Sequence, residues 1–293
     1  MTVQSFEEYY GENLGAVERA LESFLQCDGD RRMGALTEYS LERGKRLRPV
    51  LCLLSADIYS TDREKALRNA VLVEFIHSAT LIHDDVTDND AVRRGMLSLW
   101  RHLQEMPPEE SKLEPRNLAV LLGDGMLSRA LGIIDDIDTL RLTSRVIQDI
   151  ATGALREAYQ PRAGRYAPGT YTATIRLKTG SLFGLAAELG SQGAAAGPDE
   201  CVPREVGIQL GIIYQMADDL SDGDLKMGRR EVEDLLLEHC AKFSSKAGGM
   251  PKNDYRRMME EVPLFIVNAM MKEGSRGRRL ILAEGIYTWE DVH

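Results

Sequence analysis

Two acidic clusters with identical spacing are the residues of this chain whose types could carry out chemistry. The pattern Asp-Asp-x-x-Asp begins at Asp84 and again at Asp218, and each copy ends an apolar stretch with helical periodicity. On a helix, the first and last carboxylates of this pattern lie one turn apart on one face, with the middle one at its edge. Two carboxylates about 6 Å apart repel each other by about 3 kcal/mol at an effective dielectric constant of about 20. Each cluster is therefore expected to bind a cation.

Mg²⁺ is the cation that this pattern favours, because it takes one or two carboxylates, keeps several waters and completes its shell with phosphate oxygens. A calcium loop of the EF-hand type fits neither copy, because its twelfth position, which requires Glu, is Gly95 in one and Arg229 in the other. A third acidic cluster, 135–138, is interpreted as a solvated helix end. The two repeated clusters together indicate metal-dependent chemistry on a diphosphate.

The charge of the chain narrows its range of partners. A formal net charge of -10 argues against nucleic acid, whose binding normally needs a basic face. Positive charge is gathered in the short segments 43–48, 93–94 and 176–178, which suits a small anionic ligand.

No apolar run approaches the roughly 20 residues of a membrane span, and the amino terminus is acidic where a signal peptide would be basic. A cytoplasmic protein without a membrane span is expected.

The periodicity of the chain predicts an all-α fold. The 293 residues are 43% hydrophobic and contain no linker-like stretch, so a single domain over residues 1–293 is expected. Most segments show helical spacing, which predicts a bundle of about ten or more helices around a central cavity. The stretches 66–83 and 208–220 are apolar on nearly every side and should lie in the middle of that bundle. Their acidic ends could then face each other across the cavity.

With these motifs assembled, the chain resembles the trans-isoprenyl diphosphate synthases, or polyprenyl synthetases, of the class I isoprenoid synthase fold. The resemblance covers residues 40–225. Besides the two aspartate motifs, it rests on four segments in the family's order: Gly44–Pro49, Arg93–Gly95, Lys178–Gly180 and Tyr214–Gln215. It implies a homodimeric, Mg²⁺-dependent prenyltransferase that condenses isopentenyl diphosphate with an allylic diphosphate by ionisation, condensation and elimination, and releases diphosphate.

The resemblance also implies a role for individual residues. Three Mg²⁺ ions would be ligated by Asp84, Asp88 and Asp218. The catalytic residues would be Asp84, Asp85, Asp88, Arg93, Lys178, Asp218 and Asp219, with Asp222 in support. The allylic diphosphate would also contact Arg93, Lys178, Thr179 and Gln215, and isopentenyl diphosphate would contact Lys45, Arg48, His77 and Arg94. The residue types agree with this division of roles. Arginine can donate two parallel hydrogen bonds to a phosphate, whereas a carboxylate binds a phosphate only through a metal ion.

Product length is expected to depend on the helix before Asp84, where one turn of about 5.4 Å is close to the length of one isoprene unit. Five residues before Asp84, where short-chain members of the family often have an aromatic side chain, this chain has Ala79, followed by Thr80. The candidate floor lies deeper, at Ile76, Phe75 or Leu72. A product of about twenty carbons, geranylgeranyl diphosphate, or longer is predicted.

Two alternatives belong to other classes of function. A class I terpene cyclase would carry a different second metal motif and no basic segment for isopentenyl diphosphate. A non-catalytic subunit of a heteromeric synthase would usually have lost aspartates that this chain retains. One departure from the family is the short segment 223–230 after the second motif, where Lys226, Arg229 or Arg230 could replace the usual basic residues.

Overall fold

Helices make up most of the chain, as the sequence predicts. The computed structural model describes residues 4–26, 31–106, 111–160, 166–194, 201–274 and 278–291. The helices are α1 (Phe6–Leu25), α2 (Arg31–Leu41), α3 (Leu47–Tyr59), α4 (Arg63–Asp88), α5 (Leu99–Glu105), α6 (Pro115–Gly132), α7 (Ile137–Ala158), α8 (Pro168–Ile175), the π-helical turn η1 (Arg176–Gly180), α9 (Ser181–Ser191), α10 (Cys201–Asp222), α11 (Arg229–Ala247) and α12 (Asp254–Gly274). The prediction of an all-α bundle of about ten or more helices is confirmed.

Local signals set where these helices begin and end. Asp62 caps α4 by accepting hydrogen bonds from the next backbone amides, and Asn89 ends the helix in the left-handed conformation. Asp136 caps α7 through the amide of Thr139, so the third acidic cluster is a helix start. Gly223, with a φ of 76°, follows the last residue of α10. Both aspartate motifs therefore occupy the last turns of their helices.

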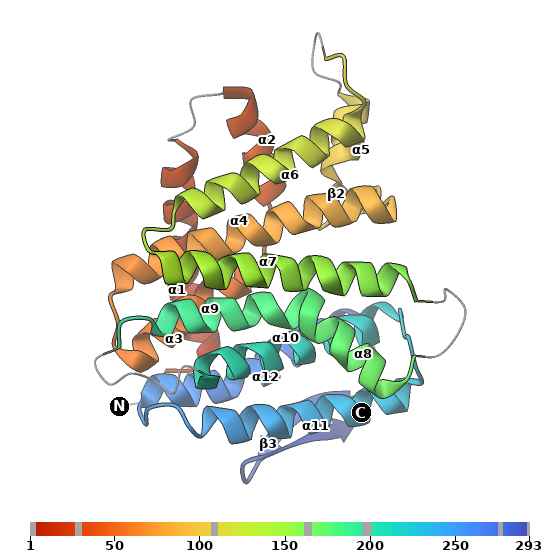
Figure 1. Ribbon diagram of the computed structural model, residues 1–293. Coiled ribbons are helices and arrows are strands. Elements are labelled where there is room, and N and C mark those ends of the chain that lie inside the picture. The colour runs from red at the N-terminus through yellow and green to blue at the C-terminus, as the bar shows by residue number, and fades with distance from the viewer. Residues whose placement is uncertain are drawn as a thin grey trace.

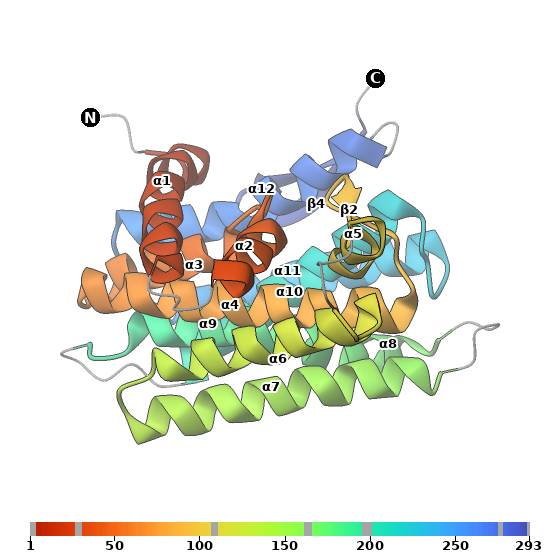
Figure 2. The ribbon, with the colours of Figure 1, turned by 90° about the horizontal axis from the view of Figure 1, so that it is seen from above.

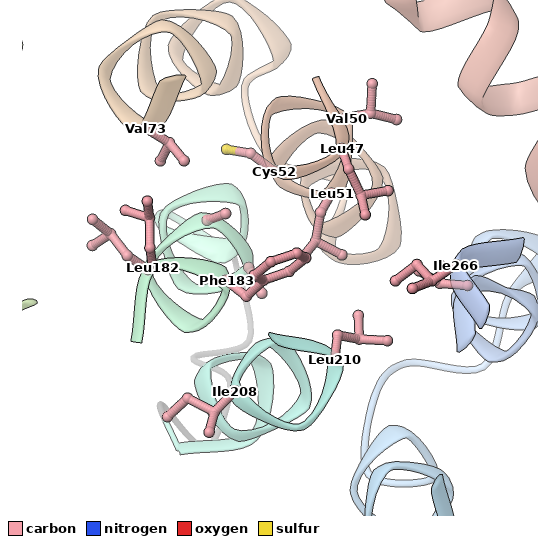
Figure 3. Packing of buried hydrophobic residues seen from close by; sticks show 14 of the residues in the cluster. Leu47, Val50, Leu51, Cys52, Val73, Leu182, Phe183, Ile208, Leu210 and Ile266 are labelled. Atoms are coloured by element: carbon pink, nitrogen blue, oxygen red, sulfur yellow. The ribbon is translucent and has the colours of Figure 1, made fainter. Parts of the chain in front are cut away.

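The two motif-bearing helices lie inside the bundle. α4 packs against α3, α6 and α9, and α10 packs against α9, α11 and α12. Figures 1 and 2 show α6 beside α4, and α7 on the same side of the bundle. Phe183 of α9 is directed between α3 and α10, next to Leu51 (Figure 3). Burying these helices on several sides accounts for their nearly uninterrupted apolar sequences.

Two short antiparallel hairpins interrupt the helical pattern. β1 (Val92–Arg93) pairs with β2 (Met96–Leu97) directly after α4, and β3 (Arg278–Ala283) pairs with β4 (Ile286–Asp291) near the carboxyl end. Neither hairpin was predicted from the sequence. The turn of the second one has positive φ angles at Glu284 and Gly285, which is the backbone that a two-residue hairpin loop requires.

The described residues show two buried free thiols, Cys52 and Cys240. Cys27 and the side chain of Cys201 lie outside the described residues. Within the described ranges, no helix is both long and apolar enough to cross a membrane.

Candidate active site

A cavity of about 680 Å³ lies between α3, α4, α7, α8, η1, α9 and α10. Most of the predicted site residues line it: Lys45, Arg48, His77, Thr80, Asp84, Asp88, Arg93, Arg94, Lys178, Thr179, Gln215, Asp218 and Asp219. The last residue of the second motif, Asp222, also lines it. Both acidic clusters thus reach the same cavity from different helices.

The first cluster divides its three carboxylates between the cavity and the protein interior. Asp84 and Asp88 line the cavity, and the Nζ of Lys178 lies 3.8 Å from Asp84. Asp85 is buried, and its Oδ1 accepts a hydrogen bond from Nε of Arg93 at 2.7 Å and forms an ion pair with Nη2 at 2.5 Å. Burial raises the pKa of Asp85 to about 6, although Arg93 acts in the opposite direction. Asp85 therefore anchors the β1–β2 hairpin to α4.

The second cluster holds its middle carboxylate with neutral donors. Asp219 accepts hydrogen bonds from the hydroxyl of Tyr171 at 2.6 Å and from Nε2 of Gln215 at 2.8 Å. The hydroxyl of Thr179 donates to Oε1 of Gln215 at 2.8 Å. Burial, followed by the charges of Asp222 and Asp219, raises the pKa of Asp218 to about 6. This chain of hydrogen bonds joins α8, η1 and α10 around Asp219.

The predicted Lys-Thr segment lies in a π-helical turn. Such turns are rare and often occur at functional sites. Gly153 allows α7 to pack closely against this turn, because a Cβ atom there would lie 2.6 Å from the backbone nitrogen of Lys178. The Lys178 ammonium also donates to Glu157 of α7 at 2.7 Å.

Glu157 and Tyr171 belong to the candidate site but were not predicted from the sequence. Both line the cavity. For Tyr171, a signal was present, because it precedes Lys178 by seven residues, close to two helical turns. For Glu157, no motif in the sequence marked it.

The basic residues Lys45, Arg48 and Arg94 line the same cavity. Nη1 of Arg48 lies 3.1 Å from Nε2 of His77, and the Arg48 guanidinium stacks 4.3 Å from the centre of the Phe183 ring. Burial and the nearby Arg48 lower the pKa of His77 well below its usual value. His77 is therefore neutral and can accept the hydrogen bond from Arg48. Lys45 is exposed at the cavity.

The short segment after the second motif brings one lysine to the cavity. Lys226 lines it, and its Nζ pairs with both carboxylate oxygens of Asp224 at 2.8 Å. Its carbonyl accepts a hydrogen bond from the amide of Tyr166. By contrast, Arg229 donates to the carbonyl of Leu220, and Arg230 is exposed and does not line the cavity.

The residues predicted to limit product length lie on two faces of α4. Thr80 lines the cavity together with His77, Leu81 and Asp84. Ala79, Ile76, Phe75 and Leu72 are fully buried and lie outside its lining. Their spacing of three and four residues places them on another face of the helix, and Phe75 contacts Arg129 of α6. The distance from Asp84 along the chain predicts how deep a residue lies along α4, but it does not predict whether the side chain faces the cavity.

The acidic residues fit an ion that arrives together with a diphosphate. Within the described part of the chain, Asp88 and Asp218 accept no hydrogen bond and form no ion pair, so their oxygens are available as hard ligands. No group of three carboxylate, imidazole or thiol side chains converges into a metal site among the described residues. Mg²⁺ needs no such group, because it binds one or two carboxylates and takes further ligands from water and phosphate.

Comparisons with known proteins agree with this chemistry. Residues 30–259 match the family model described as Polyprenyl synthetase. Hexaprenyl pyrophosphate synthase of Saccharolobus solfataricus is 28% identical, over 92% of this chain and 98% of that protein. Heptaprenyl diphosphate synthase component 2 of Geobacillus stearothermophilus is 29% identical, over 80% of this chain and 72% of that protein.

The same fold occurs in solved structures. A polyprenyl synthase from Caulobacter crescentus CB15, in complex with calcium and isoprenyl diphosphate, aligns with a TM-score of 0.75 and 23% identity, over 91% of this chain and 98% of that chain.

Proposed function

The chain belongs to the polyprenyl synthetase family of chain-elongating prenyltransferases, and from this premise we propose how its residues divide the reaction. The substrates are isopentenyl diphosphate and an allylic prenyl diphosphate. The observation that carries the proposal is that two carboxylate clusters and the basic residues Lys45, Arg48 and Arg94 line one cavity. Two diphosphates can then bind in one cavity through different chemistry.

The allylic diphosphate binds between the aspartate clusters. Enzymes of this family depend on Mg²⁺, and bound Mg²⁺ supplies Lewis-acid stabilisation of the negative charge on a diphosphate. We propose Asp84, Asp88 and Asp218 as the ligands of three ions. Asp85 and Asp219 orient neighbouring groups, and Arg93, Lys178, Thr179 and Gln215 contact the diphosphate. Lys226 adds a further positive charge from the short segment after α10.

Isopentenyl diphosphate binds at Lys45, Arg48, His77 and Arg94, which line the cavity. This places its double bond toward the allylic carbon, next to apolar walls that exclude water from the cation. Arg48 is suited to binding this diphosphate, because its contacts with the neutral His77 and the ring of Phe183 leave its positive charge unpaired with any carboxylate of the described residues. The departing diphosphate takes the proton released at the end of the step, since a strong side-chain base near the cation would itself be alkylated.

We propose that product length depends on the apolar part of the cavity lining, which includes Ile150 and Leu182, and on Thr80. Ala79, Ile76, Phe75 and Leu72 are buried outside this lining, and a product of about twenty carbons or more is proposed. Thr80→Phe should shorten the longest product by at least one isoprene unit. Ala79→Phe should shorten it less, since Ala79 lies outside the cavity lining. Equal products from wild type and both variants, read by mass spectrometry, would contradict this location.

We also propose that residues 1–293 form one domain, that the protein is cytoplasmic and that it acts as a homodimer. One hydrophobic cluster extends from Phe6 to Tyr287. The helices α6 and α7 expose Leu121, Ile137 and Leu155, each more than half accessible, as a self-association surface would. A relative named as component 2 of a synthase makes a heteromer the alternative. Light scattering of the purified chain distinguishes a dimer from a monomer that needs a partner.

Elongation assays test the proposed activity directly. The purified protein is incubated with Mg²⁺, labelled isopentenyl diphosphate and, separately, dimethylallyl, geranyl, farnesyl and geranylgeranyl diphosphates. Elongated products that vanish in Asp84→Ala are expected. No product from any primer would favour a subunit that needs its partner, and a hydrocarbon formed without isopentenyl diphosphate would favour a cyclase.

A further inference from the structure

Arg46 differs from the neighbouring basic residues because protein carboxylates bind its guanidinium. Its Nε donates to Glu18 at 2.9 Å, its Nη1 to Glu74 at 2.7 Å and its Nη2 to the carbonyl of Leu41 at 2.5 Å. The side chains of Arg46 and Glu74 are 4% and 1% exposed. Because each of its three guanidinium nitrogens already donates to a protein acceptor, Arg46 has few N–H donors free to bind a substrate phosphate.

The partners of Arg46 come from three helices. Glu18 belongs to α1, Leu41 is the last residue of α2, and Glu74 lies on α4, one turn before His77. Arg46 itself directly precedes α3. One side chain therefore fixes the start of α3 against the helix that carries His77. Lys45 and Arg48 lie on either side of that fixed point in the sequence.

The backbone around Lys45 is held in an uncommon conformation. Arg43 and Arg46 have φ angles of 54° and 49°, in the left-handed region that non-glycine residues rarely adopt. A Cβ atom on Gly44 would overlap the Arg46 guanidinium, which its three partners hold in place. The hydroxyl of Tyr10 donates to the carbonyl of Lys45. Such a turn persists only where surrounding contacts determine it.

Arg46 and Arg48 also differ in charge balance. Glu74 is a buried carboxylate in direct contact with Arg46, so the pair is close to neutral. Arg48 contacts the neutral His77, and it forms no ion pair with a carboxylate within the described residues. The charge of Arg48 is available to an anion, and the charge of Arg46 is not.

We infer that Arg46 and Glu74 are positioning residues for the diphosphate of isopentenyl diphosphate. The inference rests on the proposed function. The pair keeps the turn 43–46 in place, so that Lys45 and Arg48 meet one diphosphate together with His77. Loss of the pair should weaken binding of isopentenyl diphosphate and leave the allylic site between the aspartate clusters nearly unchanged.

Glu74→Gln is the sharpest test, because glutamine keeps the shape and one acceptor oxygen but removes the charge. The KM for isopentenyl diphosphate should rise about tenfold or more, which corresponds to about 1.4 kcal/mol. The KM for the allylic substrate should change less than about threefold on the same scale. Arg46→Lys, which keeps the charge but loses the fork, should fall between wild type and Arg46→Met.

Glu18→Gln is the matched control, since Glu18 contacts the same guanidinium but is 42% exposed. It should change neither KM by more than about twofold. Equal increases of both KM values would indicate a general structural role and overturn the inference, as would an unchanged KM for isopentenyl diphosphate in Glu74→Gln. If Glu74→Gln does not fold by circular dichroism, Arg46→Lys decides by the same criterion. Failure of the wild type to elongate any primer would instead count against the proposed function.

Discussion

The two aspartate clusters have the same sequence pattern and different surroundings. In the first, the middle aspartate is bound by a charged guanidinium, Arg93, and the ammonium of Lys178 lies 3.8 Å from Asp84. In the second, the middle aspartate is bound by the neutral groups of Tyr171 and Gln215. Within the described residues, Asp218 has no ion pair.

This difference shows that a repeated motif need not repeat its electrostatics. The first cluster has part of its negative charge balanced by side chains of the protein. The second has no ion pair to Asp218 among the described residues, and burial, followed by the charges of Asp222 and Asp219, raises the pKa of Asp218 to about 6. The second cluster should therefore depend more strongly on cations that bind with the substrate.

The largest expected effect concerns the carboxylates that face the cavity in both clusters. Asp84→Asn and Asp218→Asn should each lower kcat by about 1,000-fold or more at saturating Mg²⁺, because an amide is a neutral and weaker ligand. Asp135→Asn is the control, because Asp135 is exposed and lies outside the cavity lining. A loss of less than about tenfold in Asp218→Asn would show that the second cluster is not a metal site.

Arg93→Gln should have the next largest effect. It leaves the buried Asp85 without its charged partner, which should lower the free energy of unfolding by about 3 kcal/mol. Chemical denaturation of the metal-free protein measures this change. The control is Arg101→Gln, whose pair with Glu105 is solvent-exposed and should contribute less than about 1 kcal/mol. Similar values for both variants would mean that the Arg93–Asp85 pair does not anchor the hairpin.

Tyr171→Phe tests the neutral counterpart in the second cluster. It removes one of the two hydrogen bonds to Asp219 and should cost about 1–2 kcal/mol of stability. Activity should fall about tenfold, since Asp219 remains bound by Gln215. Tyr159→Phe, at a highly exposed position, is the matched control. A destabilisation as large as that of Arg93→Gln would remove the distinction between the clusters.

The smallest effect concerns the stability of the metal-free protein as a function of pH. Asp218 has a pKa of about 6 when folded, against about 3.9 in an unfolded chain. Between pH 4 and 6 the folded state therefore holds a proton that the unfolded state releases, and this group makes the protein less stable as the pH rises.

Asp218→Asn should remove that penalty. The variant should be about 1 kcal/mol more stable than wild type at pH 7.5, and the difference should shrink as the pH approaches 4. Thermal unfolding in the presence of a chelator provides the comparison. A variant that is less stable than wild type at pH 7.5 would show that Asp218 already has a compensating partner in the folded protein.

Much of the fold could be predicted because helical periodicity and burial leave local patterns in the sequence. The apolar stretches ending at Asp84 and Asp218 predicted α4 and α10, and the cavity between their ends agrees. The hairpin 278–291 was not predicted. A hairpin of two short strands is marginally stable by itself, and this one depends on packing against α11 and α12, which the local sequence does not reveal.

Local sequence patterns were enough to predict the helices, the two acidic clusters and the basic segment, because each depends on residues that are close together along the chain. Which donor reaches which carboxylate depends on the packing of the helices. Tyr171 and Asp219 are 48 positions apart in the chain, and Arg46 and Glu74 are 28 positions apart. Such contacts depend on how the helices pack, and the packing also decides that Thr80 faces the cavity while Ala79 does not.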